Sequence, residues 1–235
     1  MRRPRFVLGV SALLAAVAAG ALPPGAARAQ APASGTPTWL RARLDGRFDA
    51  RTRATLERVI DSALVAGVPA EPLIDKALEG ASKGASTEAV LRAVRGLAGD
   101  LTIARQALGA NTLVGEMTAG AAALRAGVEP GALRSLRRDR PGQPLVVALG
   151  VLTDLIARGV PVDGAARSVL ALTKAGIVDE QLVAFRRDVE RDIGIGAPPA
   201  VAVGVRLNGI VAYSGIGDGV LGGSARGAGG GKRRP

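Results

Sequence analysis

Apolar residues recur at helical spacing along most of this chain. Leu56, Val59, Ile60, Ala63 and Leu64 occupy positions i, i+3, i+4, i+7 and i+8, which is the buried stripe of an amphipathic helix. No segment shows a sustained alternation of apolar and polar residues, so the pattern predicts helices and no strands. Stripes of this kind lie within residues 56–64, 74–81, 90–101, 145–156, 166–173 and 182–193.

Glycine-containing breaks separate these helices. Gly67-Val68-Pro69, Gly127-Val128-Glu129-Pro130 and Gly159-Val160-Pro161 predict turns in which glycine ends one helix in a left-handed conformation. Proline cannot extend the old helix but suits the start of the next one, which explains its place after each glycine.

The breaks also recur at a fixed spacing. Segments 67–98 and 159–190 align without a gap, and a weaker copy begins at Gly127. A helical hairpin of about 32–34 residues has the size of an α-solenoid unit, although the tetratricopeptide and ankyrin patterns are absent. We therefore expect an all-α fold of repeated short helical hairpins, either a solenoid-like stack or a compact multi-helix bundle.

The first 29 residues carry the features of a secretory signal peptide. Three arginines precede an uncharged run from Phe6 to Leu22, and Ala27-Arg28-Ala29 offers a small-x-small cleavage site. An uncleaved membrane anchor is the alternative, but 17 residues lie at the short limit for spanning a bilayer. We expect cleavage before Gln30, export to the periplasm or the exterior, and no membrane span afterwards.

The remaining chain divides into three predicted parts. Residues 30–48 are expected to form a linker and an N-terminal arm, in which Trp39 caps one end of the helices by burying its ring. Residues 49–213 are the predicted helical domain. Residues 214–235 form a glycine-rich basic tail, for which disorder is expected because it has few apolar anchors.

The composition excludes many kinds of catalytic and metal-binding site. The 235 residues include no cysteine and no histidine, so disulfides, thiolate nucleophiles, Ser-His-Asp sites and Cys- or His-ligated metals are excluded. Gly217-Asp218-Gly219-Val220-Leu221-Gly222 has the letters of a dinucleotide-binding loop, but the chain ends soon after it. We predict no catalytic residue, no cofactor and no metal.

The charge is positive, with 31 Lys and Arg residues against 20 Asp and Glu, and it concentrates at the two ends. Cleavage at the predicted site removes four arginines and no acid, which lowers the net charge from +11 to +7. An anion-binding surface is predicted from a basic helix and from the tail. Its residues are Arg134, Arg137, Arg138, Arg140, Lys232, Arg233 and Arg234.

Three functions are compatible with this sequence. The leading hypothesis is an exported, non-catalytic helical protein that acts as an interaction or scaffold module in the cell envelope. The second is a binder of anionic lipid headgroups, lipopolysaccharide or acidic wall polymer; nucleic acid is disfavoured because aromatic stacking platforms are lacking. The third is a glycan hydrolase that uses the carboxylates of Glu116 and Asp154.

Overall fold

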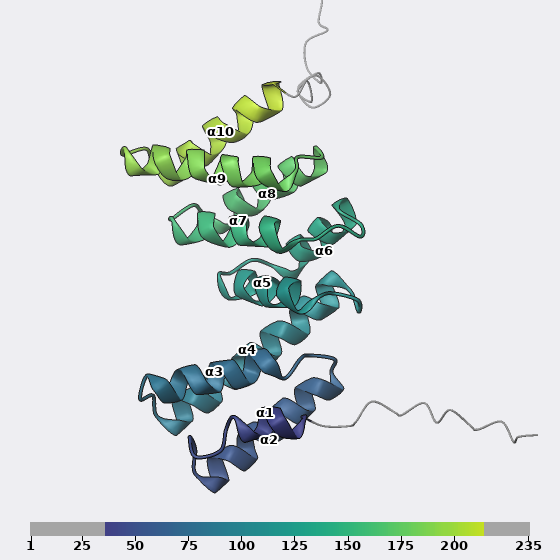
Figure 1. The fold of residues 1–235 in the computed structure, drawn as a ribbon. Coiled ribbons are helices and arrows are strands. Elements are labelled where there is room, and N and C mark those ends of the chain that lie inside the picture. Colours follow the sequence, from purple (N-terminus) through teal and green to yellow (C-terminus); the bar gives the residue numbers. More distant parts are fainter. Residues whose placement is uncertain (1–35, 214–235) are drawn as a thin grey trace, which may run out of the picture. The chain divides into compact units, whose positions relative to one another are not determined.

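The computed structural model describes residues 36–213, which form ten helices and no strand (Figure 1). The all-α prediction is therefore confirmed. The predicted signal peptide, residues 1–29, and the predicted tail, residues 214–235, lie outside the described residues. The helices are α1 (Thr38–Ala42), α2 (Ala50–Val65), α3 (Glu71–Ser82), α4 (Thr87–Leu108), α5 (Val114–Arg125), α6 (Pro130–Asp139), α7 (Val146–Ala157), α8 (Val162–Lys174), α9 (Asp179–Gly194) and α10 (Pro199–Tyr213).

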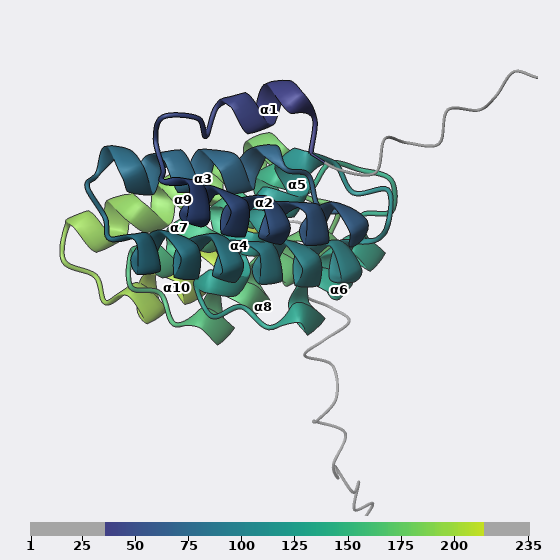
Figure 2. The same cartoon turned by 90° about the horizontal axis from the view of Figure 1, so that it is seen from below.

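The described helices pack in chain order into a multi-helix bundle. Every extensive contact joins helices that are one or two places apart in the chain. Helices α2, α4, α6, α8 and α10 follow one another in one layer, which we call the even layer. Helices α5, α7 and α9 form a second layer against it, and α3 packs on α4 (Figures 1 and 2). The 32-residue repeat itself stays a prediction.

Aliphatic side chains fill the interior. Leu56, Leu73, Leu101, Leu133 and Leu149 are fully buried, and each contributes roughly 1.5–3 kcal/mol relative to an exposed position. Phe185 is the one aromatic residue among the large side chains that are fully buried in the described part of the chain. The core thus depends on Leu, Ile, Val and Ala.

The glycine turns take the predicted geometry. At the end of α2, Gly67 has a φ of 76°, its N–H donates to the carbonyl of Leu64, and the N–H of Val68 donates to the carbonyl of Ala63. This pair of bonds is the Schellman motif, which supplies donors to the last carbonyls of a helix. Val68 then folds back and is 1% exposed. The same pair of bonds ends α3, α5, α7, α8 and α9 at Gly84, Gly127, Gly159, Gly176 and Gly196.

The N-terminal arm packs differently from the expectation. Helix α1 and the turn after it cover one end of the bundle with Leu40 and Leu44, which are buried, whereas Trp39 is 64% exposed. The expectation that Trp39 buries its ring is wrong, because Leu40 and Leu44 provide the buried contacts of this arm and leave Trp39 on its exposed side. Polar bonds hold this arm: Asp61 of α2 accepts from the N–H and hydroxyl of Thr36 and from Arg41, at 2.8–3.1 Å.

Candidate functional site: a cationic groove between α2 and α4

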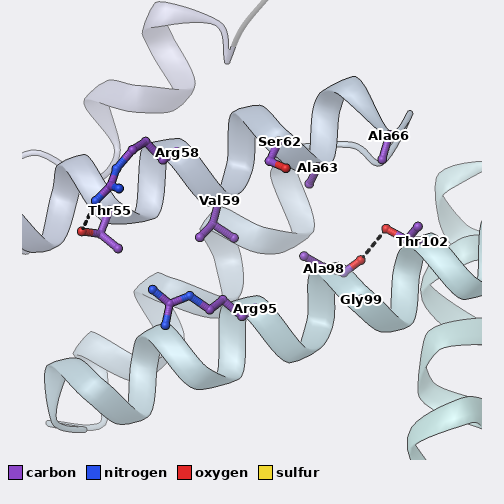
Figure 3. A pocket seen from close by; sticks show the side chains of 10 residues that line it. All are labelled: Thr55, Arg58, Val59, Ser62, Ala63, Ala66, Arg95, Ala98, Gly99 and Thr102. Carbon is purple, nitrogen blue, oxygen red and sulfur yellow. Dashed lines mark hydrogen bonds between the residues drawn. The ribbon is translucent and has the colours of Figure 1, made fainter.

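A groove of about 390 Å³ runs along the surface between α2 and α4 (Figure 3). The two helices run in the same direction, since Gly67 at the end of α2 lies against the guanidinium of Arg105 near the end of α4. The groove is lined by Thr55, Arg58, Val59, Ser62, Ala63 and Ala66 from the α2 side, and by Arg95, Ala98, Gly99 and Thr102 from α4.

The first half of the groove is cationic. Arg58 of α2 and Arg95 of α4 line it from opposite sides (Figure 3). Arg51 lies two turns before Arg58, and Arg92 lies one turn before Arg95, and both are exposed. Within the described residues, none of these four guanidinium groups has a carboxylate within 4.0 Å. Their charge is therefore available to a ligand.

Local bonds orient this region without neutralising it. The Nε of Arg58 donates to the carbonyl of Ala54 at 3.3 Å, and its Nη2 donates to the hydroxyl of Thr55 at 3.0 Å. The hydroxyl of Thr55 in turn donates to the carbonyl of Arg51. These bonds direct the Arg58 side chain along α2 while leaving its positive charge uncompensated, so the site attracts anions more strongly than neutral molecules.

The second half of the groove is lined by uncharged residues. Ala66, Ala98 and Gly99 offer small side chains or none, and the hydroxyl of Thr102 donates to the carbonyl of Ala98 at 2.8 Å. On the same two helices, Val65 is 90% exposed and Ile103 is 40% exposed. This half therefore presents small uncharged groups, and the guanidinium of Arg105 lies just beyond it, against Gly67.

The second layer handles its charge in the opposite way. On α9, Arg186 donates to Asp154 of α7 at 2.9 Å and to Glu190 at 3.3 Å, and Arg191 pairs with Asp188 at 2.8 Å. Arg125 of α5 pairs with Asp100 at 2.6 Å. Most cations of the second layer are thus paired with a carboxylate. In the even layer, by contrast, exposed cations without a carboxylate partner occur on four helices. These unpaired residues are Arg51, Arg58, Arg92, Arg95, Arg134, Arg167 and Lys174.

The structure separates the four arginines of the predicted anion-binding helix. Arg134 and Arg138 are exposed, although Arg138 donates to Ser135 and lies 3.6 Å from Asp139. Arg137 instead pairs with the buried Glu116 at 2.7 Å. Arg140 is buried and donates to Asp179 and to the carbonyl of Ile177.

Arg137 and Arg140 are thus ion-pair partners inside the fold, and they leave Arg134 and Arg138 as the surface part of the predicted cluster. Helix periodicity alone did not reveal this division. The remaining predicted residues, Lys232, Arg233 and Arg234, lie outside the described residues.

The two carboxylates of the hydrolase hypothesis have separate partners. Glu116 accepts from Arg137 and, at 2.8 Å, from the N–H of Leu145, so it joins α5 to the start of α7. Asp154 accepts from Arg186. Each carboxylate accepts hydrogen bonds from a neighbouring helix, which suits a structural ion pair rather than an acid–base couple.

Carboxylates that accept several hydrogen bonds have lowered pKa values. Hydrogen bonds from Lys76 and Lys83 lower the pKa of Glu79 to about 2. Burial opposes ionisation of Asp61, but its bonds from Thr36 and Arg41 outweigh that effect and lower its pKa. The hydrogen bond with Arg206 is the main reason that the pKa of Asp192 is lowered. All of these acids are charged at neutral pH.

No family model, curated protein or solved structure matches this chain. Within residues 36–213, no three His, Cys, Asp or Glu side chains are grouped so that they could hold a metal ion. The described helices also include none with the length and apolar character needed to cross a bilayer. The function must therefore be inferred from the geometry and charge of the groove.

Proposed function

We propose that this protein is an exported, non-catalytic interaction module that binds an acidic region of a partner protein in the cell envelope. The observation that carries this proposal is the group of four exposed arginines on α2 and α4 without a carboxylate partner. An arginine that faces an acid has its charge offset within the fold, and most arginines of the second layer do face one. An unpaired group on one face instead steers and orients an oppositely charged partner.

The same layer supports a second candidate function. Arg134 of α6, and Arg167 and Lys174 of α8, extend the unpaired charge beyond the groove. A polymer or membrane with repeated negative charges would contact several of these positions at once. Binding to acidic lipid headgroups, lipopolysaccharide or acidic wall polymer is therefore the alternative, and it would use the whole even layer rather than the groove.

Binding measurements on the full chain test the charge contribution. Polyglutamate serves as the acidic protein probe, and vesicles containing an anionic phospholipid serve as the second probe. We expect the double variant Arg58→Ala/Arg95→Ala to lose about tenfold in affinity for polyglutamate, since two desolvated charge contacts contribute about 1.4 kcal/mol or more. The affinity of the original chain should fall steeply with salt because screening shortens to about 8 Å at physiological ionic strength.

The single variants Arg58→Ala and Arg95→Ala have a matched control in Arg187→Ala, which removes one exposed and unpaired arginine from α9 in the second layer. The affinity of the control should equal that of the original chain. Equal losses in Arg187→Ala and in the two single variants would show that only net charge matters, and this result would reject a localised site. Vesicle binding that depends on Arg134 and Arg167 rather than Arg58 and Arg95 would favour the alternative.

Export is tested separately. If the leader is cleaved as predicted, N-terminal sequencing of the protein recovered from the periplasm or medium begins at Gln30. Recovery of an intact Met1 terminus in the membrane fraction would instead support the anchor.

A further inference from the structure

The lining of the groove between α2 and α4 changes from cationic to uncharged along its length. This change limits the kind of partner that can bind there. The first half of the groove contains Arg58 and Arg95, with Arg51 and Arg92 on the preceding turns. Its second half is lined by Ser62, Ala63, Ala66, Ala98, Gly99 and Thr102. A ligand that fills both halves therefore needs negative charge opposite the arginines and small, mostly uncharged groups along the rest.

We infer that this groove binds an amphipathic helix of a partner protein, with acidic residues on its first turns and small apolar residues on the following turns. This inference rests on the proposed function. The groove extends along α2 from Thr55 to Ala66. At 1.5 Å per residue this is roughly 16 Å, which matches three turns of a docked helix.

A helix fits the chemistry of the groove better than an extended peptide. The hydroxyls of Thr55 and Thr102 already donate to carbonyls of their own helices. In the second half of the groove, where Ser62 offers the remaining hydroxyl, an extended peptide would bury backbone groups opposite few free partners, at a cost in free energy. A helix satisfies its backbone internally and needs from the groove only apolar contact and opposite charge.

The absence of a side chain at Gly99 allows a docked helix to approach α4 closely. A Cβ built on Gly99 would have no atom within 4 Å apart from its own helix, so the space beside it is open. The groove is also shallow and open to solvent, without an enclosed apolar chamber for an acyl chain. Both observations favour a rod lying along the surface over an inserted lipid tail.

Two synthetic peptides test this inference with the full chain. The first is a 14-residue amphipathic helix with Glu on its first two turns and Ala and Leu on one face of the rest. The second has the same composition in a scrambled order that destroys the apolar face. Fluorescence anisotropy should show that the amphipathic peptide binds at least tenfold more tightly than the scrambled one.

A matched pair of glycine substitutions shows whether the groove is the binding site. Gly99→Leu fills the groove, whereas Gly96→Leu adds the same side chain to an exposed position of α4 outside it. Neither glycine has a neighbour within 4 Å of an added Cβ, so we expect both variants to fold, as thermal unfolding will show. Gly99→Leu should weaken peptide binding at least tenfold, and Gly96→Leu should leave it unchanged.

The outcomes separate this inference from the proposed function. If Arg58→Ala/Arg95→Ala weakens binding but Gly99→Leu does not, the acidic-partner function stands and the groove inference is overturned. If neither change affects binding, both are rejected. If Gly99→Leu abolishes binding to anionic vesicles while the amphipathic and scrambled peptides bind alike, the groove takes a lipid, and the helix inference is also overturned.

Discussion

The two layers of this bundle use arginine for different purposes. In the second layer, Arg125, Arg186 and Arg191 each lie 2.6–2.9 Å from a carboxylate. In the even layer, Arg58 and Arg95 lie on either side of a groove with no such partner. The difference shows that a count of charges does not identify a binding surface: the informative quantity is which cations the fold leaves unpaired.

The largest expected effect separates a structural arginine from a surface arginine of the same cluster. Arg140→Ala removes a buried guanidinium that joins Asp179 to the carbonyl of Ile177, and we expect a loss of about 3 kcal/mol in the free energy of unfolding. Arg134→Ala, its control, should change this free energy by no more than about 0.5 kcal/mol. Urea titration measures both, and equal values would contradict the division of the cluster.

The next effect concerns Gly67, the turn at the end of α2 beside the groove. Alanine at this left-handed position is strained, and its Cβ would lie 2.6 Å from the Cζ of Arg105. The guanidinium is the far end of a flexible side chain and can move aside, so we expect Gly67→Ala to lower the free energy of unfolding by about 1–2 kcal/mol, chiefly through backbone strain. Gly84→Ala also adopts a positive φ and meets no atom within 4 Å, so a similar loss is expected. A thermal melt in which Gly67→Ala is far less stable than Gly84→Ala would refute this account and show that Arg105 cannot move.

Acid should weaken the ion pairs that Glu79 forms with Lys76 and Lys83. Because the pKa of Glu79 is lowered from 4.5 to about 2, its ion pairs with Lys76 and Lys83 stabilise the fold fully above pH 4.5 and lose that effect as the pH falls toward 2. Unfolding titrations between pH 6 and 2 should therefore show a smaller acid-induced loss of stability in Glu79→Gln than in the original chain. Identical pH profiles for the two proteins would show that this pair contributes nothing.

The smallest expected effect on stability concerns the unpaired arginines on the turns before the groove. Arg51→Ala and Arg92→Ala remove exposed guanidinium groups without carboxylate partners, so each should alter the free energy of unfolding by less than about 0.5 kcal/mol. Chemical denaturation is a sufficient measurement. A loss above 1 kcal/mol in either variant would mean that the residue stabilises the fold, and the contrast between the two layers would then weaken.

Much of the helical structure could be predicted from local pattern. The stripe from Leu56 to Leu64 lies within α2, and the glycines at 67, 127 and 159 end helices as expected. Helices α5 and α10 gave no clear stripe, because α5 carries small or apolar residues on several faces and α10 is largely apolar throughout. In such segments, periodicity does not distinguish the buried face from the exposed one.

No residue of the groove was predicted from the sequence. The arginines around Arg134 lie close together in the chain, which led to their prediction, whereas Arg58 and Arg95 are 37 positions apart. The spacing of Arg51 and Arg58 on one side of α2 is the local signal that the sequence does carry. The matching position of Arg95 was not visible, because it depends on how α4 lies beside α2.

Local sequence specifies most of the helices and the turns between them, because apolar periodicity and the preference of glycine for positive φ act over fewer than ten residues. The composition also rules out histidine and cysteine chemistry. Which arginines meet an acid depends on the packing of the helices, since Arg137 pairs with Glu116 and Arg140 with Asp179 from distant segments. Ion pairing acts over a few ångströms in space, and packing rather than chain position sets that distance.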